Sequence, residues 1–348
     1  MTKWHRFLLF GILVGILLNA LLLITGCAVA PAATQMDATE PAAPTTSAAP
    51  VATPESTPTA KPEPTPFSFA WMSDTQEYAA NRNDIFCGMT QWIADTQTDY
   101  NTILTIHTGD MIRGSYKDYQ WDNMKAAFAL LPADMRILTV GGNHDLESFW
   151  DQYTPYLDHR PDTDLNPDGF FDPDGYARFL TFEAGGVPFL IFSISYGYER
   201  EAESWINETC QKYADHFTIL CFHSYLDPGG YSSVGRYLLD SVVGANPNIR
   251  MVLCGHEPGA AYLPVEFDDD GDGTMDRTVF QMMFNLQHEQ DGGGGYLRIL
   301  RFDPAKDTIE VVTYSPYLDK FGCDLNYGDD FGESKILENA GLGVFLKQ

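Results

Sequence analysis

The residues of this chain best suited to chemistry lie in short polar clusters, each of which follows an apolar run. In chain order they are Ser73-Asp74-Thr75-Gln76, Thr108-Gly109-Asp110, Gly141-Gly142-Asn143-His144-Asp145, the lone His223 and Cys254-Gly255-His256. Carboxylate, amide and imidazole groups in this number can hold two divalent metal ions and still leave one imidazole as a proton donor. Two such ions acidify a bridging water and neutralise the charge on phosphoryl oxygens. The inventory therefore supplies the groups that hydrolysis of a phosphate ester requires.

The order of the clusters resembles that of the calcineurin-like metallophosphoesterases, whose generic pattern is DxH, GDxx, GNHD, a lone histidine and GHxH. The resemblance runs from about Phe69 to His256 and extends more loosely to Tyr317. It implies two divalent metal ions (Mn, Fe, Zn or Mg) and six ligands: Asp74, Gln76, Asp110, Asn143, His223 and His256. Asp110 would bridge the two ions. His144 would not bind metal but would stabilise or protonate the departing oxygen.

The chain departs from this pattern at two positions. Gln76 stands where DxH has its histidine, and Pro258 stands where GHxH has its second histidine. Both changes fall among the ligands expected for the first metal ion, whereas the ligand set expected for the second ion is complete. A glutamine carbonyl oxygen can bind a hard cation, but proline offers no side-chain ligand. We therefore expect a first site that is weaker or richer in oxygen. By resemblance, SDTQ in place of DxH occurs among secreted bacterial members of the superfamily, so the change does not imply loss of activity.

Two functions remain open at this point. The first is a surface-tethered hydrolase of phosphate mono- or diesters, which the intact second set and His144 favour. The alternative is a non-catalytic surface binding module that retains the phosphoesterase fold with one metal ion, which Gln76 and Pro258 favour. Arg113, three residues after Asp110, could contact the phosphate of a substrate.

The apolar runs before the clusters must position them. These runs are short, β-branched and nearly continuous, which is typical of strands buried on both faces. They cover residues 66–72, 102–106, 136–140, 217–222 and 249–254. Helical patterns over residues 82–98 and 119–131 alternate with them and predict a layered α/β fold. The clusters would then meet at the carboxyl ends of the strands, where such sheets bind ligands.

The C-terminal part predicts further strands at residues 278–285, 296–302 and 308–314. They suggest a second sheet that packs against the first. The family resemblance implies a four-layer αββα sandwich of two mixed β-sheets flanked by helices. We assign residues 67–348 to this calcineurin-like metallophosphoesterase domain.

Residues 1–27 are typical of a lipoprotein signal peptide. Lys3 and Arg6 precede an apolar stretch over residues 7–24, which ends in a small-residue site. Ile24-Thr25-Gly26-Cys27 resembles a bacterial lipobox, in which the cysteine is lipidated and becomes the new N-terminus. The alternative is an uncleaved transmembrane anchor. Either interpretation places the domain on the extracellular face of the cell membrane, and the lipobox predicts a lipid anchor at Cys27.

Residues 28–66 consist mainly of Ala, Pro, Thr, Ser and Glu, so we expect a disordered tether. The net charge of −27 argues against nucleic-acid polymers as partners. An acidic protein can still bind a small phosphate ester when metal cations supply local positive charge. The expected partners are therefore such an ester and the membrane, the latter through the lipid anchor.

A second acidic cluster lies further along the chain. Asp268, Asp270 and Asp272 alternate as in an EF-hand loop, and Asp276 completes the candidate set. Val279 occupies the position where a bidentate Glu should stand, so an acidic hairpin turn is favoured over a Ca²⁺ site. No CxxC pair exists, and Cys221 and Cys254 are expected to be buried thiols rather than ligands or a disulfide.

Overall fold

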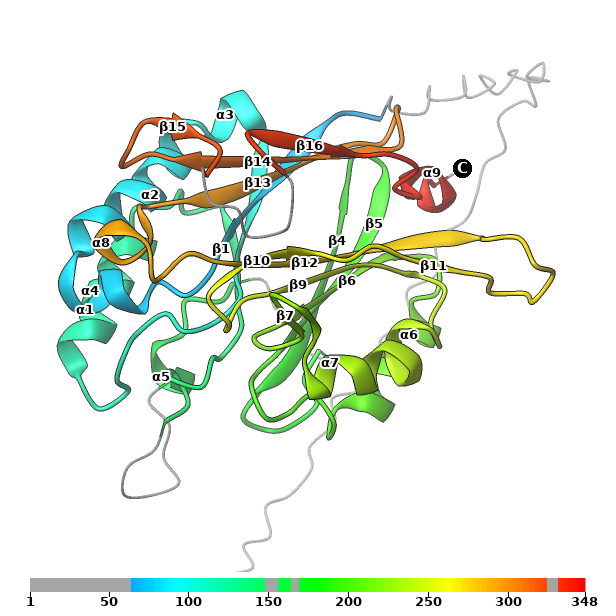
Figure 1. Cartoon of the computed structure of the whole chain (residues 1–348), viewed down its shortest axis with the longest axis horizontal. Helices are drawn as coiled ribbons and strands as arrows, with labels where there is room; N and C mark the ends of the chain where they lie inside the picture. Colours follow the sequence, from blue (N-terminus) through cyan, green and yellow to red (C-terminus); the bar gives the residue numbers. More distant parts are fainter. Residues whose placement is uncertain (1–63, 148–155, 164–168, 324–330, 348) are drawn as a thin grey trace, which may run out of the picture. The chain divides into compact units, whose positions relative to one another are not determined.

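The computed structural model describes residues 64–147, 156–163, 169–323 and 331–347. These residues form two seven-stranded sheets that pack face to face, with helices on both outer faces (Figure 1). The predicted four-layer αββα sandwich of two mixed β-sheets is confirmed. The predicted signal peptide, Cys27 and nearly all of the tether lie outside the described residues.

The first sheet has the strand order β15-β14-β13-β1-β2-β3, and β16 pairs with β14. Its strands are β1 (Phe67–Met72), β2 (Thr102–His107), β3 (Arg136–Thr139), β13 (Leu297–Asp303), β14 (Thr308–Ser315), β15 (Lys320–Phe321) and β16 (Ser334–Leu337). Strands β1, β2 and β3 are parallel, and β13 is antiparallel to β1. The carboxyl ends of β1, β2 and β3 therefore lie at one edge of this sheet.

The second sheet has the order β10-β12-β9-β6-β5-β4, and β11 pairs with β12. Its strands are β4 (Ala177–Ala184), β5 (Val187–Ile194), β6 (Phe217–Phe222), β9 (Ile249–Cys254), β10 (Gly259–Tyr262), β11 (Val265–Phe267) and β12 (Arg277–Asn285). Strands β5, β6, β9 and β12 are parallel to one another. A separate small hairpin consists of β7 (Leu226–Asp227) and β8 (Gly230–Tyr231).

Helices cover the two outer faces of the sandwich, whereas the C-terminal helix α9 (Leu342–Phe345) packs its apolar side chains into the core between the two sheets. The other helices are α1 (Gln76–Asn81), α2 (Asn83–Asp95), α3 (Gln97–Tyr100), α4 (Asp118–Phe128), α5 (Tyr156–His159), α6 (Glu203–Lys212), α7 (Ser233–Leu238) and α8 (Gln290–Gly293), with a π-helical turn η1 (Leu239–Val243) after α7. Apolar residues of α2 and α4 pack against β1 and β13, and those of α6, α7 and η1 pack against β5, β6 and β9. Both helical patterns read from the sequence, at 82–98 and 119–131, correspond to helices.

The distribution of the C-terminal strands differs from the prediction. Those at 296–302 and 308–314 do not build a second sheet, since β13 and β14 complete the first sheet beside β1. Only the segment at 278–285 joins the second sheet, as β12 parallel to β9. An apolar run specifies a buried strand but not the neighbour with which that strand pairs. The polar clusters therefore come from the strand ends of two facing sheets rather than one.

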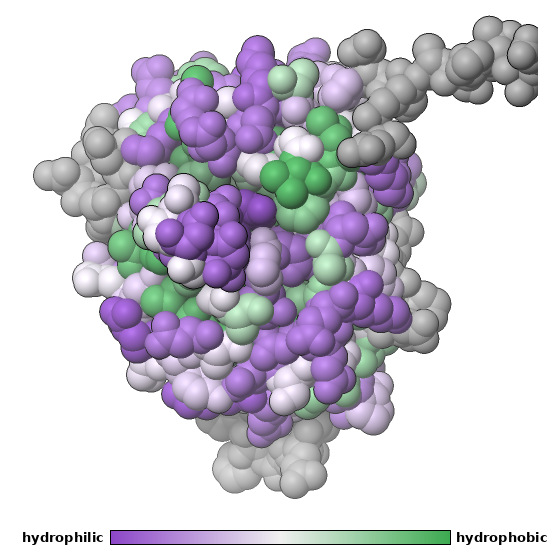
Figure 2. All heavy atoms as spheres, turned by 90° about the vertical axis from the view of Figure 1, so that its right-hand side faces the viewer, coloured by the Kyte–Doolittle hydropathy of each residue, from purple (hydrophilic) through white to green (hydrophobic). Residues whose placement is uncertain are grey.

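The face in Figure 2 is mainly hydrophilic, with its apolar residues in small separate groups. Within the ranges that the structure describes, no helix combines the length and the apolar character needed to cross a membrane.

A cluster of aromatic rings fills the space between the sheets. The Phe189 ring lies 5.3–5.6 Å, centroid to centroid, from five other phenylalanine rings: Phe67, Phe69, Phe182, Phe217 and Phe302. Phe189 is fully buried. It therefore joins strands β1 and β13 of one sheet to β4 and β6 of the other.

Phe189→Ala is expected to lower the free energy of unfolding by about 3–5 kcal/mol, because it leaves a cavity between the sheets. Chemical denaturation checks this value. The control is Val344→Ala, since the Val344 side chain is 72% exposed and should change stability little. Equal stability of the two variants would contradict the assignment of Phe189 to the core.

Candidate metal centre

The predicted site residues converge where the two sheets meet. Asp74 follows β1, Asp110 follows β2 and Asn143 follows β3, whereas His223 and His256 follow β6 and β9 of the second sheet. Backbone hydrogen bonds join the loops: Asp74 N donates to Gly109 O, and Gly255 N donates to His223 O, both at 3.0 Å. The two sheets are joined by His256 N, which donates to Asp74 Oδ2 at 3.1 Å.

Three of the predicted ligands have left-handed backbone conformations. The φ angles are 52° for Asp74, 54° for Asp110 and 71° for His256. This region is uncommon for residues other than glycine, and it persists where surrounding contacts impose it. Clustering of such residues at one place is typical of a functional site.

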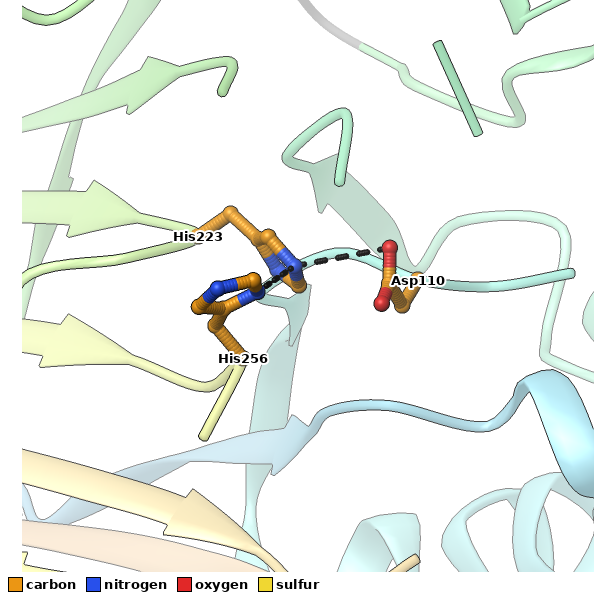
Figure 3. Close-up of side chains that lie close together, drawn as sticks. All are labelled: Asp110, His223 and His256. Carbon is orange, nitrogen blue, oxygen red and sulfur yellow. Dashed lines mark hydrogen bonds and ion pairs between the residues drawn. The ribbon is translucent and has the colours of Figure 1, made fainter. Parts of the chain in front are cut away.

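Asp110, His223 and His256 form the core of the centre, as Figure 3 shows. One ligand atom from each lies within 4.8 Å of the others. The His223 Nε2 atom lies 3.4 Å from Asp110 Oδ1, 3.1 Å from Asn143 Oδ1 and 3.1 Å from His256 Nδ1. The structure therefore brings together the whole set predicted for the second metal ion.

The His223 ring is held in a single orientation. Its Nδ1 donates to the Thr108 carbonyl at 2.9 Å, so Nε2 faces the other ligands. A hydrogen bond of this kind at the distal nitrogen is typical of metal-binding histidines. Burial opposes charging of this ring, but the Asp110 and Asp74 carboxylates outweigh it and raise the pKa of His223 to about 10. Burial and the nearby His223 lower the pKa of His256, which favours the neutral form that binds metals.

The first-metal position is made of oxygen donors. Asp74 and Gln76 are almost fully buried, at 1% and 2% exposure. Asp74 Oδ1 and Gln76 Oε1 are both buried without a hydrogen-bond partner. Burial and, to a smaller extent, the Asp110 carboxylate raise the pKa of Asp74 to about 7. Unpartnered acceptor oxygens and neighbouring carboxylates are features that a divalent cation would satisfy, so the residues present fit the metal ions that the resemblance implies.

Two glycines permit this close packing. A Cβ atom on Gly142 would lie 2.2 Å from Asp110 Oδ1, and one on Gly109 would lie 2.4 Å from His223 Nδ1. The φ of Gly109 is also 104°, which disfavours any side chain there. The glycines in TGD and GGNHD therefore leave room for the ligands of neighbouring loops.

His144 lies at the rim of the centre with its side chain 40% exposed. Its backbone N donates to Asp110 Oδ1 at 2.9 Å, and its Nε2 lies 4.0 Å from Asp110 Oδ2. The ring Nδ1 bonds to the Arg113 carbonyl at 2.9 Å. Since a carbonyl can only accept, Nδ1 carries a hydrogen and Nε2 is the nitrogen available to a substrate. The Arg113 guanidinium pairs with Glu77 at 3.3 Å and is 55% exposed.

Several residues that support the centre have no role that the sequence motifs predict. Asp145 is fully buried and accepts hydrogen bonds from three backbone amides, those of Met111, Ile112 and Gly142. It thereby fixes the loop after β2 to the loop after β3. The position of Asp145 in the GGNHD motif is the sequence feature that could have indicated this role. Gln287, which follows β12, accepts a hydrogen bond from Gln76 at 2.6 Å, and no motif marked it.

The second acidic cluster forms the turn between β11 and β12. Asp268, Asp270 and Asp276 have carboxylate oxygens within 4.8 Å of one another, whereas Asp272 accepts from the Thr274 amide at 2.7 Å. The Asp268 carboxylate accepts from the amides of Gly271, Asp272 and Gly273. Asp268 and Asp272 thus support the backbone of the turn through these hydrogen bonds. Cys221 and Cys254 are buried free thiols.

A family model of the calcineurin-like phosphoesterases matches residues 67–260. The chain belongs to this family. Family members usually bind two divalent metal ions, and Asp110, His223 and His256 form a possible cluster for one of them.

A curated relative is the Bacillus subtilis (strain 168) protein described as "Uncharacterized protein YvnB", with 35% identity over 268 residues. The match covers 76% of this chain but only 20% of that protein. The chain is also similar to a solved dimetal phosphatase from Danio rerio, with 11% identity, a TM-score of 0.48, and coverage of 72% of this chain and 96% of that one. A purple acid phosphatase from yellow lupin (Lupinus luteus) seeds has 13% identity, a TM-score of 0.47, and coverage of 74% and 53%.

Asp145→Ala is expected to leave three buried amides without an acceptor, each at a cost of about 1–3 kcal/mol. We therefore expect a loss of several kcal/mol in the free energy of unfolding, together with weaker metal binding, measured by denaturation and by calorimetric metal titration. Asp134→Ala is the control, because Asp134 is exposed. Unchanged stability and unchanged metal affinity of Asp145→Ala would contradict its role as the link between the two loops.

Proposed function

We propose that this chain is a metal-dependent hydrolase of phosphate mono- or diesters that acts on the extracellular face of the cell membrane. The observation that carries the proposal is the convergence of Asp110, Asn143, His223 and His256, with His144 beside them at the rim. Family membership and the two orphan oxygens of Asp74 and Gln76 also support it.

Divalent ions at such a centre supply an acidified water and neutralise charge on the phosphoryl oxygens. The chain's own residues would hold these ions and protonate the leaving group. Asp110 lies against His223 and accepts a hydrogen bond from Gln76 Nε2, so it would be able to hold an ion at either position. His144 offers Nε2 to the departing oxygen, and the Arg113 carbonyl keeps the ring in that orientation.

A cavity of about 420 Å³ lies beside the second-metal ligands and is the proposed seat for the organic group of the ester. Its lining includes Tyr196 and Ser224, the residue after His223. The Tyr196 ring lies 5.4 Å from the His256 ring, centroid to centroid, and is 40% exposed. Glu199 and Glu201 outnumber Arg200 in the lining, so the cavity disfavours a polyanionic group. Small esters with an uncharged organic group are the proposed substrates.

The proposed location depends on residues 1–66 alone. The basic and apolar start, the lipobox-like Cys27 and the Pro- and Ala-rich stretch support a secreted, lipid-anchored and tethered domain. Globomycin treatment of producing cells, which blocks cleavage of lipoprotein signals, should cause a longer precursor to accumulate; unchanged processing would contradict the lipobox interpretation.

His144→Ala is expected to lower kcat for an alkyl phosphate ester by about 10²–10⁴, because proton donation to the leaving group is lost. With p-nitrophenyl esters, whose leaving group needs little protonation, the loss should be much smaller. Initial rates of the Mn²⁺-loaded full chain give both values, and chelation should abolish both reactions. If the wild-type chain turns over no ester, the binding-module alternative replaces the hydrolase.

Tyr196→Ala is expected to raise KM for aryl phosphates, because a stacking face of the cavity is lost. Aromatic pairs contribute about 0.5–1.5 kcal/mol, so the expected increase is about two- to tenfold, with a smaller change in kcat. Phe321→Ala is the control, since Phe321 is also exposed but lies in β15. An unchanged KM for Tyr196→Ala would contradict the proposal that this cavity binds the organic group of the ester.

A further inference from the structure

The Gln76 carboxamide is oriented by two acceptors. Its Nε2 donates to Gln287 Oε1 at 2.6 Å and to Asp110 Oδ2 at 3.3 Å. Both amide hydrogens are thus engaged, and the other end of the amide, Oε1, has no hydrogen-bond partner although it is buried. A buried acceptor without a partner is unfavourable, so Oε1 is available to a group outside the chain, such as a cation or a water molecule.

Asp74 repeats this arrangement. Its Oδ2 atom accepts from Ser73 Oγ at 2.5 Å and from the His256 amide at 3.1 Å. Its Oδ1 atom, in contrast, is buried without a partner. Two side chains of the same centre therefore each keep one acceptor oxygen free, while their other polar atoms are hydrogen-bonded.

Gln287 is itself held in place from the second-metal side. Its backbone N donates to Asn285 Oδ1 at 3.0 Å, and Asn285 Nδ2 donates to the His256 carbonyl at 2.8 Å. A continuous series of hydrogen bonds thus runs from His256 through Asn285 and Gln287 to Gln76. It joins a ligand of the second metal ion to the altered position of the first.

We propose that Gln287 is the positioning residue that makes Gln76 a metal ligand. Its Oε1 can only accept, so it draws the Gln76 amide nitrogen toward itself and leaves Gln76 Oε1 for the ion. Gln76 Oε1, Asp74 Oδ1 and Asp110 then form an oxygen-only first site, which takes a hard divalent cation such as Mn²⁺ or Mg²⁺. Gln287 compensates for the histidine absent at Pro258 by orienting a ligand instead of supplying one. This inference rests on the proposed two-metal centre.

The test is a titration of the metal-free full chain with Mn²⁺. Binding is measured by calorimetry and by the electron paramagnetic resonance signals of free and bound Mn²⁺. The wild type should bind two ions in a tight and a weak step. Gln287→Met keeps the length of the side chain but removes the acceptor, so the weak step should lose about tenfold or more in affinity. The tight step, which uses His223 and His256, should change far less.

Two further variants isolate the effect of the acceptor. Gln287→Glu retains an acceptor oxygen and should keep two Mn²⁺ ions. Gln290→Met makes the same chemical change three residues later, at the start of α8, but Gln290 hydrogen-bonds to Asp291 rather than to Gln76, so both steps should match the wild type. Circular dichroism establishes that each variant is folded. Should Gln287→Met fail to fold, Gln287→Asn, whose shorter side chain withdraws the acceptor, provides the same comparison.

The inference is overturned if the wild type binds only one Mn²⁺, if Gln287→Met retains the weak step unchanged, or if Gln290→Met loses it equally. Because the readout is binding, the result is separate from that of the proposed function. A chain that binds two ions through Gln287 but hydrolyses no ester would refute the hydrolase and leave this role of Gln287 in place.

Discussion

The burial of the Asp110 carboxylate is the constraint on which the rest of the centre depends. Asp110 is 2% exposed, and an isolated ion in such a place would be strongly unfavourable. The structure compensates with the His144 amide, the His223 ring and the Gln76 amide, which come from three separate segments of the chain. Burial opposes its ionisation, but His223 outweighs that effect and lowers the pKa of Asp110. The loops that stabilise this charge are therefore the ones that carry the metal ligands.

The second half of the centre was predictable from the sequence, because each ligand directly follows a buried strand. The run before His223 and the run before His256 are continuous and β-branched, and their ends could meet only at one edge of a parallel sheet. The pairing of β13 and β14 with β1 was not predictable, since apolar content does not specify a partner strand. It follows that the sequence predicted the members of the site but not that two sheets supply them.

The supporting residues were harder to find for a different reason. Gln287 contacts Gln76 across 211 positions of sequence, and a lone glutamine after a strand has no characteristic spacing. Asp145 was visible within GGNHD, but its three amide partners lie in two loops, one of them 33–34 residues upstream. Hydrogen bonds to backbone groups leave no pattern in the partner's side chains, because every residue other than proline offers the same amide. Roles of this kind therefore depend on the folded arrangement and cannot be predicted from the spacing of residues in the sequence.

The origin of the ligands in both sheets also has a thermodynamic consequence. An ion held by Asp110 from one sheet and by His223 and His256 from the other would act as a clasp across the sandwich, in parallel with the aromatic rings around Phe189. Ligands that bind only the folded state stabilise it by about 2.7 kcal/mol at a concentration one hundred times Kd. The free energy of unfolding of this domain would then depend on the concentration of divalent cations around it, because the ligands proposed for catalysis would also join the two sheets.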